Sequence, residues 1–374
     1  MENLIHRLDF YLEEPLSPQS IADLYSFTDV NKRYIGIPEE IDALWIKLRY
    51  HNLQGDGFAH TTEMIRAALK NPEQIIILWA ADSLIVPDEW WITDRLNAFS
   101  DTIPNPIILF TGCLPTKPID YGTLKFTISP ISYFEYESKK TWDEWAPEPR
   151  MLDDRSKKFL NMGTKDYPYR KFLLSHIIQN DLLKDGFVSY KALNNGTLSP
   201  SQYTPEQANE IITQANSIDA YLPLPHLDDS EEYTRMPRNF MSDSYLNMVT
   251  DTFYEPTVGT FISEKVFNAI RHQQMFMMMS PPHTLQYLRD DGYKTFGNYI
   301  DESYDTMENS YHRLMSLTKS FTDFVKQPIE RIREIYIDCK PIIQHNAQRL
   351  EDTKFSEFVI SELNRAKREK TQTK

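Results

Sequence analysis

The chain has 374 residues, a formal net charge of −14 at pH 7 and only two cysteines, while 41% of its residues are hydrophobic and 13% are aromatic. This composition predicts two or three packed domains and excludes a disordered chain. The acidic balance argues against an extended nucleic-acid-binding face, and Cys113 and Cys339 are too few for a disulfide framework or a thiolate zinc site.

The sequence also gives no sign of a membrane segment. No window approaches the run of about 18 apolar residues that a membrane span requires, and the start MENLIHRLDFYLEE lacks the basic-then-apolar order of a secretory signal. We therefore expect a cytoplasmic protein with no membrane partner.

The first 150 residues alternate between helical and strand patterns. Helical spacing is present in IPEEIDALWIKLRYHNL (37–53), TTEMIRAALKN (61–71) and DEWWITDRLNAFS (88–100). Apolar runs typical of strands in a parallel sheet are EQIIILWAADSLIV (73–86), NPIILFTGCLP (105–115) and LKFTISPISYFEY (124–136). This alternation predicts an α/β domain over residues 1–150, and the charged, proline-rich stretch at 141–157 is the expected linker.

The same alternation resumes after the linker and predicts a second α/β domain over residues 151–310. The predicted strands are KKFLNM (157–162), GFVSYKAL (186–193), SYLNMVTDTFYE (244–255), MFMMMS (275–280) and GYKTF (292–296). The predicted helices are YRKFLLSHIIQNDLLKDG (169–186), TPEQANEIITQANS (204–217), a helix from Ser263 and HTLQYLRDDG (283–292), with a polar loop GTKDYP at 163–168. Residues 311–374 show helical periodicity broken at Pro328 and Pro341, which predicts a closing helical layer.

The stretch FISEKVFNAIRHQQMFMMMS, from Phe261 to Ser280, is the segment most suggestive of chemistry. Ser263 is an N-cap type of residue, so Glu264 and Lys265 fall in the first turn of a helix that points its free N–H groups at the carboxyl edge of the sheet. Open α/β domains bind phosphate-bearing ligands at this edge. Lys265 would add a positive charge for a diphosphate, and Glu264 would accept hydroxyl groups of a ribose or sugar. The alternative is that Ser263 and Glu264 only cap the helix, while the methionines are plain core.

Two stretches of this sequence resemble known glycosyltransferases. The run from Phe261 to Asp305 resembles the C-terminal signature of glycosyltransferases found in phages and large viruses. More distantly, Ser263-Glu264-Lys265 is similar to the donor-binding motif of fucosyltransferase-like and exostosin-like enzymes with the GT-B fold, and Asp301 stands at the closing aspartate-rich loop of that signature.

The second matching stretch is FLNMGTKDYPYRKFLLSHIIQNDLLKDGFVSY (159–190), where the resemblance implies that Asn161 and Arg170 face the donor, with Arg170 on its phosphates. The chain departs from the family pattern at Gly163-Thr164-Lys165, where more basic character is expected. It departs again at Asn268-Ala269, in place of a Lys-Pro that often follows the Glu-Lys pair. The resemblance extends over about residues 158–310.

The resemblance implies a fold of two Rossmann-like domains facing across a cleft, with the C-terminal helices packing back across them. It also implies a hexosyl- or pentosyltransferase that moves a sugar from a nucleotide-diphosphate sugar to an acceptor, either a glycan or a modified base in viral DNA. The donor is a co-substrate, and no other cofactor is expected. No D-x-D motif is present, so we expect a metal-independent enzyme, located in the host cytoplasm if the chain is viral.

An inverting enzyme of this kind needs a general base from the first domain. Asp82 follows an apolar strand pattern directly, and Asp56 and His60 lie in the glycine-flanked stretch LQGDGFAH. Asp82 and Asp56 are the leading candidates, although turn or cap carboxylates would have the same pattern. Trp90 and Trp91 could form a stacking platform for a sugar or base, although the pattern favours a helix core.

Two other classes of protein are compatible with parts of this pattern. A non-catalytic module that keeps the GT-B fold and binds a nucleotide sugar without turnover would explain the departures at 163–165 and 268–269. A different nucleotide-using enzyme, such as a kinase, is disfavoured because the chain has neither a G-x-x-x-x-G-K-[ST] loop nor a glycine-rich kinase loop.

Overall fold

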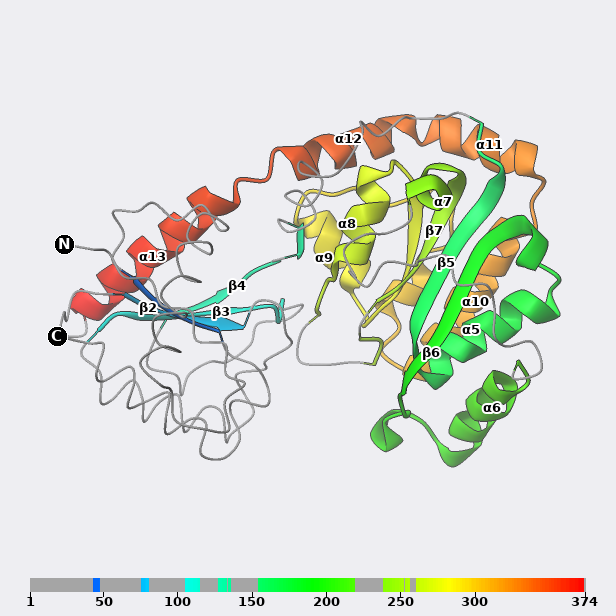
Figure 1. Cartoon of the computed structure of the whole chain (residues 1–374), viewed down its shortest axis with the longest axis horizontal. Helices are drawn as coiled ribbons and strands as arrows, with labels where there is room; N and C mark the ends of the chain where they lie inside the picture. The colour runs from blue at the N-terminus through cyan, green and yellow to red at the C-terminus, as the bar shows by residue number, and fades with distance from the viewer. Residues whose placement is uncertain are drawn as a thin grey trace, which may run out of the picture. The chain divides into compact units, whose positions relative to one another are not determined.

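The computed structural model describes residues 43–47, 75–80, 105–114, 127–132, 134–135, 154–218, 238–251, 253–255 and 260–372 (Figure 1). The chain divides into two compact units. The first comprises Met1–Tyr133 and Lys354–Lys374, and the second comprises Phe134–Thr353. This division differs from the boundaries predicted at residues 150 and 310, because only the last helix belongs to the first unit and the helices before it belong to the second.

The first unit contains a parallel sheet with the strand order β1-β2-β3-β4. The strands are β1 (Ala43–Lys47), β2 (Ile75–Ala80), β3 (Ile107–Thr111) and β4 (Thr127–Pro130). All five side chains of β3 are buried, as expected for a strand covered on both faces. Helix α13 (Phe355–Gln372) belongs to the same unit, and the Arg365 guanidinium donates to the carbonyl of Ile128 at 2.9 Å.

One helix prediction in this unit is wrong. Residues 43–47 lie within the stretch 37–53 that was assigned to a helix, but they form β1 and pair in parallel with residues 75–79 of β2. A short apolar run such as Ala-Leu-Trp-Ile has no periodicity that separates a buried strand from a buried helix. The strands predicted around β2, β3 and β4 are confirmed, and the helices predicted at 61–71 and 88–100 lie outside the described residues.

The second unit contains a parallel sheet with the order β6-β5-β7-β8. The strands are β5 (Lys157–Asp166), β6 (Gly186–Asn195), β7 (Ser244–Thr250) and β8 (Met275–Met279). From β5 the chain first steps to β6 on one side and later returns to β7 on the other, so the direction of winding reverses between β5 and β7. This order is typical of a Rossmann-like domain, in which such a switch point opens a crevice at the carboxyl ends of the strands.

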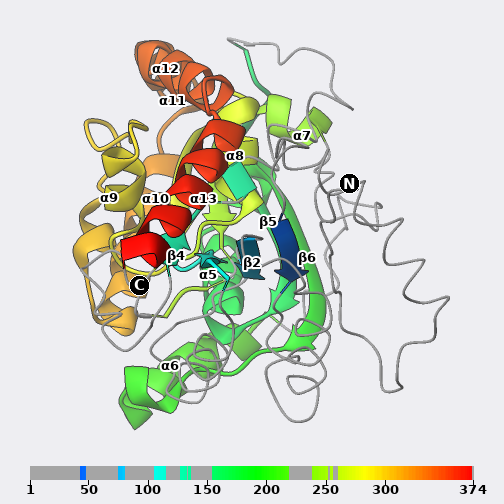
Figure 2. The same ribbon diagram turned by 90° about the vertical axis from the view of Figure 1, so that its left-hand side faces the viewer.

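Helices surround this second sheet. They are α5 (Pro168–Gln179), α6 (Pro205–Asn216), α7 (Arg238–Ser242), α8 (Glu264–Arg271), α9 (Thr284–Asp290), α10 (Ser310–Val325), α11 (Ile329–Asp338) and α12 (Lys340–Glu351), with 3₁₀ turns η2 (Leu183–Asp185), η3 (Pro200–Gln202) and η5 (Ser303–Thr306). Helix α10 packs on α5 and β8, whereas α12 packs on α8. Helices α7 and α11 lie near the amino-terminal ends of the strands in both views (Figures 1 and 2).

The methionine strand β8 is buried over its whole length, which agrees with the plain core interpretation. Phe159 of β5 packs edge-on against Phe321 of α10 at 5.0 Å between ring centroids, so the core continues between the sheet and this helix. The helix breaks predicted at Pro328 and Pro341 are confirmed: Pro328 precedes α11, and Pro341 lies in the first turn of α12.

Two local predictions in this unit are wrong. Residues 292–296 form no strand, because their backbone groups pair with side chains: Lys294 exchanges two hydrogen bonds with Asn346, and the Phe296 N–H donates to Glu302. The polar loop predicted at 163–168 starts later, because β5 continues through Asp166 by means of register shifts that keep it paired with β6.

Candidate functional site

The switch point between β5 and β7 holds a buried arginine. Arg170 lies in the first turn of α5, directly after β5, and is 4% exposed. Its guanidinium donates to the backbone carbonyl of Asp251, and its central carbon lies 5.3 Å from the ring centroid of Tyr167. The Nε of Arg170 is buried and finds no hydrogen-bond acceptor in the part of the chain that the structure describes. A buried guanidinium with a spare donor is suited to an anion.

Asp251 joins this arginine to the start of α8. It follows the last residue of β7 and is fully buried. Its backbone N–H donates to the carbonyl of Met279 at the end of β8 at 3.0 Å, and its carboxylate Oδ2 accepts from the backbone N–H of Ser263 at 3.5 Å. One residue therefore connects the ends of β7 and β8 with Arg170 and the first residues of α8.

Helix α8 begins at Glu264, as predicted, with Ser263 in the N-cap position. The Ser263 hydroxyl makes no capping hydrogen bond to the helix and instead accepts from the Lys265 Nζ at 3.2 Å. The same ammonium lies 3.3 Å from a carboxylate oxygen of Glu264. The Lys265 side chain is 20% exposed and the Glu264 side chain is 13% exposed. Because Ser263 does not cap the helix, the first N–H groups of α8 keep their donor capacity and Lys265 is held beside them.

Asn161 lies deeper in the same sheet. Its Nδ2 donates to the carbonyl of Met248 at 2.9 Å, and the side chain is 5% exposed. Close by, the Thr250 hydroxyl donates to the carbonyl of Met162 at 3.2 Å. These two bonds tie β5 to β7 near the switch point, so the observed contact of the Asn161 amide is with the sheet. Its predicted contact with a donor stays a prediction.

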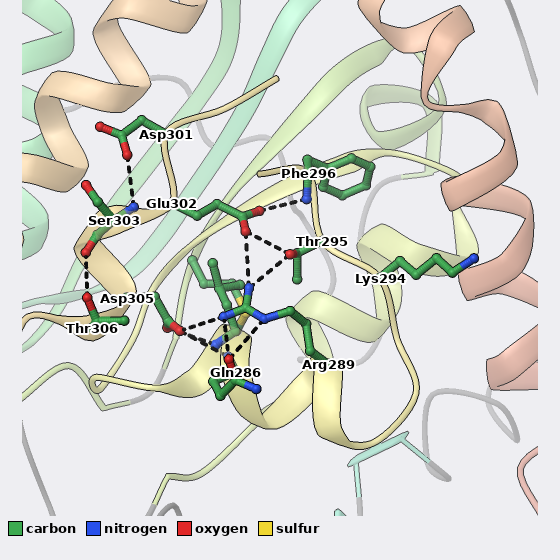
Figure 3. A network of polar contacts seen from close by, with 12 residues as sticks. Gln286, Arg289, Lys294, Thr295, Phe296, Asp301, Glu302, Ser303, Asp305 and Thr306 are labelled. Atoms are coloured by element: carbon green, nitrogen blue, oxygen red, sulfur yellow. Dashed lines mark hydrogen bonds and ion pairs between the residues drawn. The ribbon is translucent and has the colours of Figure 1, made fainter. Parts of the chain in front are cut away.

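The aspartate-rich loop performs a different local task (Figure 3). The Asp301 carboxylate accepts from the Ser303 N–H at 3.0 Å, and this backbone hydrogen bond lowers the pKa of Asp301. Asp305 accepts from the N–H groups of Leu285 and Gln286 at 2.9 and 3.0 Å and so caps α9. Within the described contacts Asp301 does not join the Arg170 group, and its predicted donor contact stays a prediction.

The remainder of that loop forms a buried ionic network. Glu302 accepts from Thr295, from the Phe296 N–H and from Arg289, at 2.7, 2.7 and 3.2 Å (Figure 3). Burial raises the pKa of Glu302, and it also raises the pKa of Asp305. The network fixes α9 and the turn before it, where His283 has a left-handed backbone with φ of 65°.

The structure therefore brings together four of the predicted donor-binding residues and adds one. Arg170, Ser263 and the adjacent Lys265 belong to one group, with Glu264 paired to Lys265, and Asp251 is the residue that sequence reasoning missed. Its signal was an acidic residue directly after the strand-forming residues SYLNMVT. The candidate bases Asp56 and Asp82, together with His60, Trp90 and Trp91, lie outside the described residues.

Neither a metal cluster nor a membrane helix is found in the described ranges. No group of three or more His, Cys, Asp or Glu side chains there is arranged to hold a metal ion. None of the described helices has both the length and the apolar character needed to cross a membrane.

No protein-family model matches this sequence, and no curated protein matches it either. Among solved structures, the chain is similar to two UDP-forming α,α-trehalose-phosphate synthases. The one from Burkholderia vietnamiensis has a TM-score of 0.44 and 12% identity over 82% of this chain and 79% of that one. The one from Burkholderia xenovorans has a TM-score of 0.42 and 10% identity over 94% and 80%. An α1,3-fucosyltransferase gives a TM-score of 0.30 and 9% identity over 84% and 92%. Similarities at this level establish neither a family nor an activity.

Proposed function

We propose that this protein is a glycosyltransferase that moves a sugar from a nucleotide-diphosphate sugar to an acceptor hydroxyl. The observation that carries the proposal is Arg170, a buried guanidinium with a spare Nε donor at the switch point of a Rossmann-like sheet, linked through Asp251 to the start of α8. The sequence resemblance around 159–190 and 261–305 supports the same assignment.

The chemistry of the reaction fits these residues. When the glycosidic bond to the donor breaks, negative charge develops on the leaving nucleoside diphosphate, and positioned donors must stabilise it. The Arg170 guanidinium offers a forked donor for a phosphate, and the first N–H groups of α8 add aligned backbone dipoles. In this assignment Lys265 exchanges its contacts with Ser263 and Glu264 for a phosphate oxygen. Glu264 is then released to accept a ribose or sugar hydroxyl.

Several finer statements belong to the same proposal. The transferred group is a hexose or pentose, the reaction runs without a metal ion, and either Asp56 or Asp82 deprotonates the acceptor. A glycan and a modified base in viral DNA are the two acceptor classes. The phage or viral origin and the cytoplasmic location also stay predictions. A module that binds the nucleotide sugar without turnover is the alternative, and it predicts the same donor contacts.

The test is a panel of UDP-, GDP- and ADP-sugars added to the full-length protein, with melting temperature and release of free nucleoside diphosphate as the two readouts. A donor at 100 times its Kd stabilises the folded state by about 2.7 kcal/mol, which a thermal shift detects readily. The proposal predicts a shift and slow donor hydrolysis with at least one sugar nucleotide. A shift with neither donor hydrolysis nor transfer to an acceptor supports the binding module instead.

Substitutions at the proposed donor site test whether the thermal shift arises from binding there. Arg170→Met and Lys265→Ala are expected to weaken the shift, whereas Arg331→Met is the matched control, because its side chain is half exposed and pairs with Glu334 on the same helix. If no sugar nucleotide shifts the wild-type protein, the proposed function is wrong.

A further inference from the structure

The chain passes between its two units twice, and the residues on the second-unit side of both crossings meet. The crossings are at Tyr133–Phe134 and at Thr353–Lys354. The Thr353 hydroxyl donates to a carboxylate oxygen of Glu135 at 2.6 Å, so two segments that are 218 residues apart in sequence are joined directly. The Glu135 side chain is 8% exposed, and the contact with Thr353 is partly buried.

Arg349 of α12 ties a third segment to the same point. Its guanidinium donates to the same Glu135 oxygen at 3.0 Å, to the Asp291 carboxylate at 3.1 Å and to the Asp291 carbonyl at 3.0 Å. The Tyr293 hydroxyl also donates to that Glu135 oxygen, at 2.7 Å. Three donors from two segments, the end of α12 with Thr353 and the turn that carries Tyr293, thus converge on one carboxylate oxygen of the segment at Glu135. We call Glu135, Asp291, Tyr293, Arg349 and Thr353 the crossing clamp.

The backbone at Gly292 allows this approach. Its φ is +89°, a conformation that favours glycine, and a Cβ built there would lie 3.4 Å from the Arg349 Nε. On α12, His345 contacts the Gly292 carbonyl through its Nε2 at 2.9 Å. Arg349 is therefore held against the turn that carries Asp291 and Tyr293.

The clamp has one positive charge for two carboxylates. Glu135 and Asp291 both contact the Arg349 guanidinium, and among the residues that the structure describes Tyr287 and Tyr293 also face them, with the more exposed His345 on the neighbouring Gly292 carbonyl. Burial raises the pKa of the Tyr287 and Tyr293 phenols, so both stay neutral near pH 7. With both carboxylates ionised, the two like charges repel one another across a shared cation.

We propose that the crossing clamp is a proton-sensitive device that holds both chain crossings together, tightening when Asp291 takes up a proton and loosening when Asp291 releases it. With Asp291 neutral, the charge of Arg349 is balanced by Glu135 and the repulsion between the two carboxylates disappears. Burial is the main cause that raises the pKa of Asp291 to about 6, and the charge of Glu135 is the second cause. The change in the protonation of Asp291 therefore falls within the pH range of cells and their compartments. Because one oxygen of Glu135 serves both segments, the two crossings loosen together.

The test is peptide-resolved hydrogen exchange on the full-length protein at pH 5 and pH 8, corrected for the intrinsic exchange rates. The peptides that contain Glu135 and Thr353 are the readout. In the wild type, protection of both is expected to fall together from pH 5 to pH 8. Thr353→Val, which removes one donor at constant shape, is expected to speed exchange in both by about fivefold, and Arg349→Met by about tenfold or more.

Asp291→Asn separates the proton-sensitive role from a merely structural one. This variant keeps an oxygen for Arg349 and loses the ionisation, so its protection is expected to stay high and equal at both pH values. Arg331→Met, on the exposed face of α11, is the control and should leave both peptides unchanged. The proposal is overturned if Thr353→Val speeds exchange in only one peptide, or if Asp291→Asn keeps the pH dependence of the wild type. Both variants decide the question even if Arg349→Met fails to fold.

Discussion

Arg155→Met is expected to destabilise the second unit strongly, because one buried guanidinium there holds the ends of several segments. Arg155 lies just before β5 and is 4% exposed. Its two terminal nitrogens donate at 2.7–3.2 Å to the carbonyls of Met241, Ser244, His272 and Gln273 and to the hydroxyl of Tyr336. The guanidinium also lies 4.8 Å from the Tyr336 ring centroid. Burial lowers the pKa of Arg155, but the group stays charged at neutral pH.

The magnitude follows from these contacts. A hydrogen bond to a charged group contributes about 1.5–3 kcal/mol, and a buried carbonyl left without a donor costs about 1–3 kcal/mol. Removing the buried cation recovers part of this, since its desolvation no longer opposes folding. We expect a net loss of roughly 3–5 kcal/mol, which is a large fraction of the roughly 5–15 kcal/mol that stabilises a typical domain.

The assay is urea denaturation followed by far-UV circular dichroism, with hydrogen exchange of peptides from β5 and β7 to assign the transition to the second unit. Arg333→Met is the matched control, because Arg333 is 46% exposed and pairs at 3.0 Å with Asp154, which is 77% exposed. An exposed pair of this kind contributes about 0–1 kcal/mol. If Arg155→Met lowers the free energy of unfolding no more than Arg333→Met does, the bonds of Arg155 do not stabilise the unit as described.

Three further predictions concern backbone, packing and pH. Gln273 has φ of +54° just after α8, a left-handed backbone that is strained for a residue with a side chain. Gln273→Gly should therefore raise the free energy of unfolding by about 0.5–1 kcal/mol in urea denaturation, and a decrease would contradict this strain. A Cβ at Gly196 would lie 2.0 Å from the Tyr167 ring, so Gly196→Ala should lower the free energy of unfolding by about 1–3 kcal/mol. An unchanged midpoint of urea denaturation would refute this. Because the pKa of Asp291 is raised to about 6, the stability that its protonated form contributes is complete below about pH 4 and is lost as the pH rises through 6. Asp291→Asn should therefore exceed the wild type by about 1 kcal/mol at pH 8, and parallel pH profiles of the two proteins would disprove it.

The strands and most helices of the second unit could be predicted because their signals are local. β8 is a continuous apolar run, and α8 follows a serine with an acidic first turn. Residues 43–47 and 292–296 were assigned wrongly because their structure depends on distant partners, namely β2 for the first and Asn346 and Glu302 for the second. The local sequence of a short segment does not indicate such distant partners.

The candidate site was predicted in part for the same reason. Arg170 and Ser263 lie at helix starts, which the sequence marks, whereas Asp251 matters only because β7, β8 and α8 end or begin beside it. The acidic loop was expected to face a ligand through Asp301. Its neighbours Glu302 and Asp305 instead use their carboxylates to hold α9, a choice that depends on where Arg289 lies.

The most direct test of the proposed donor site is a crystal structure of the protein soaked with a nucleoside diphosphate. The account predicts density for the diphosphate at the carboxyl ends of β5 and β7, with a phosphate oxygen within hydrogen-bond distance of the Arg170 guanidinium and of the first N–H groups of α8. A nucleotide bound elsewhere, or a bound nucleotide with no phosphate oxygen within hydrogen-bond distance of the Arg170 guanidinium, would contradict it.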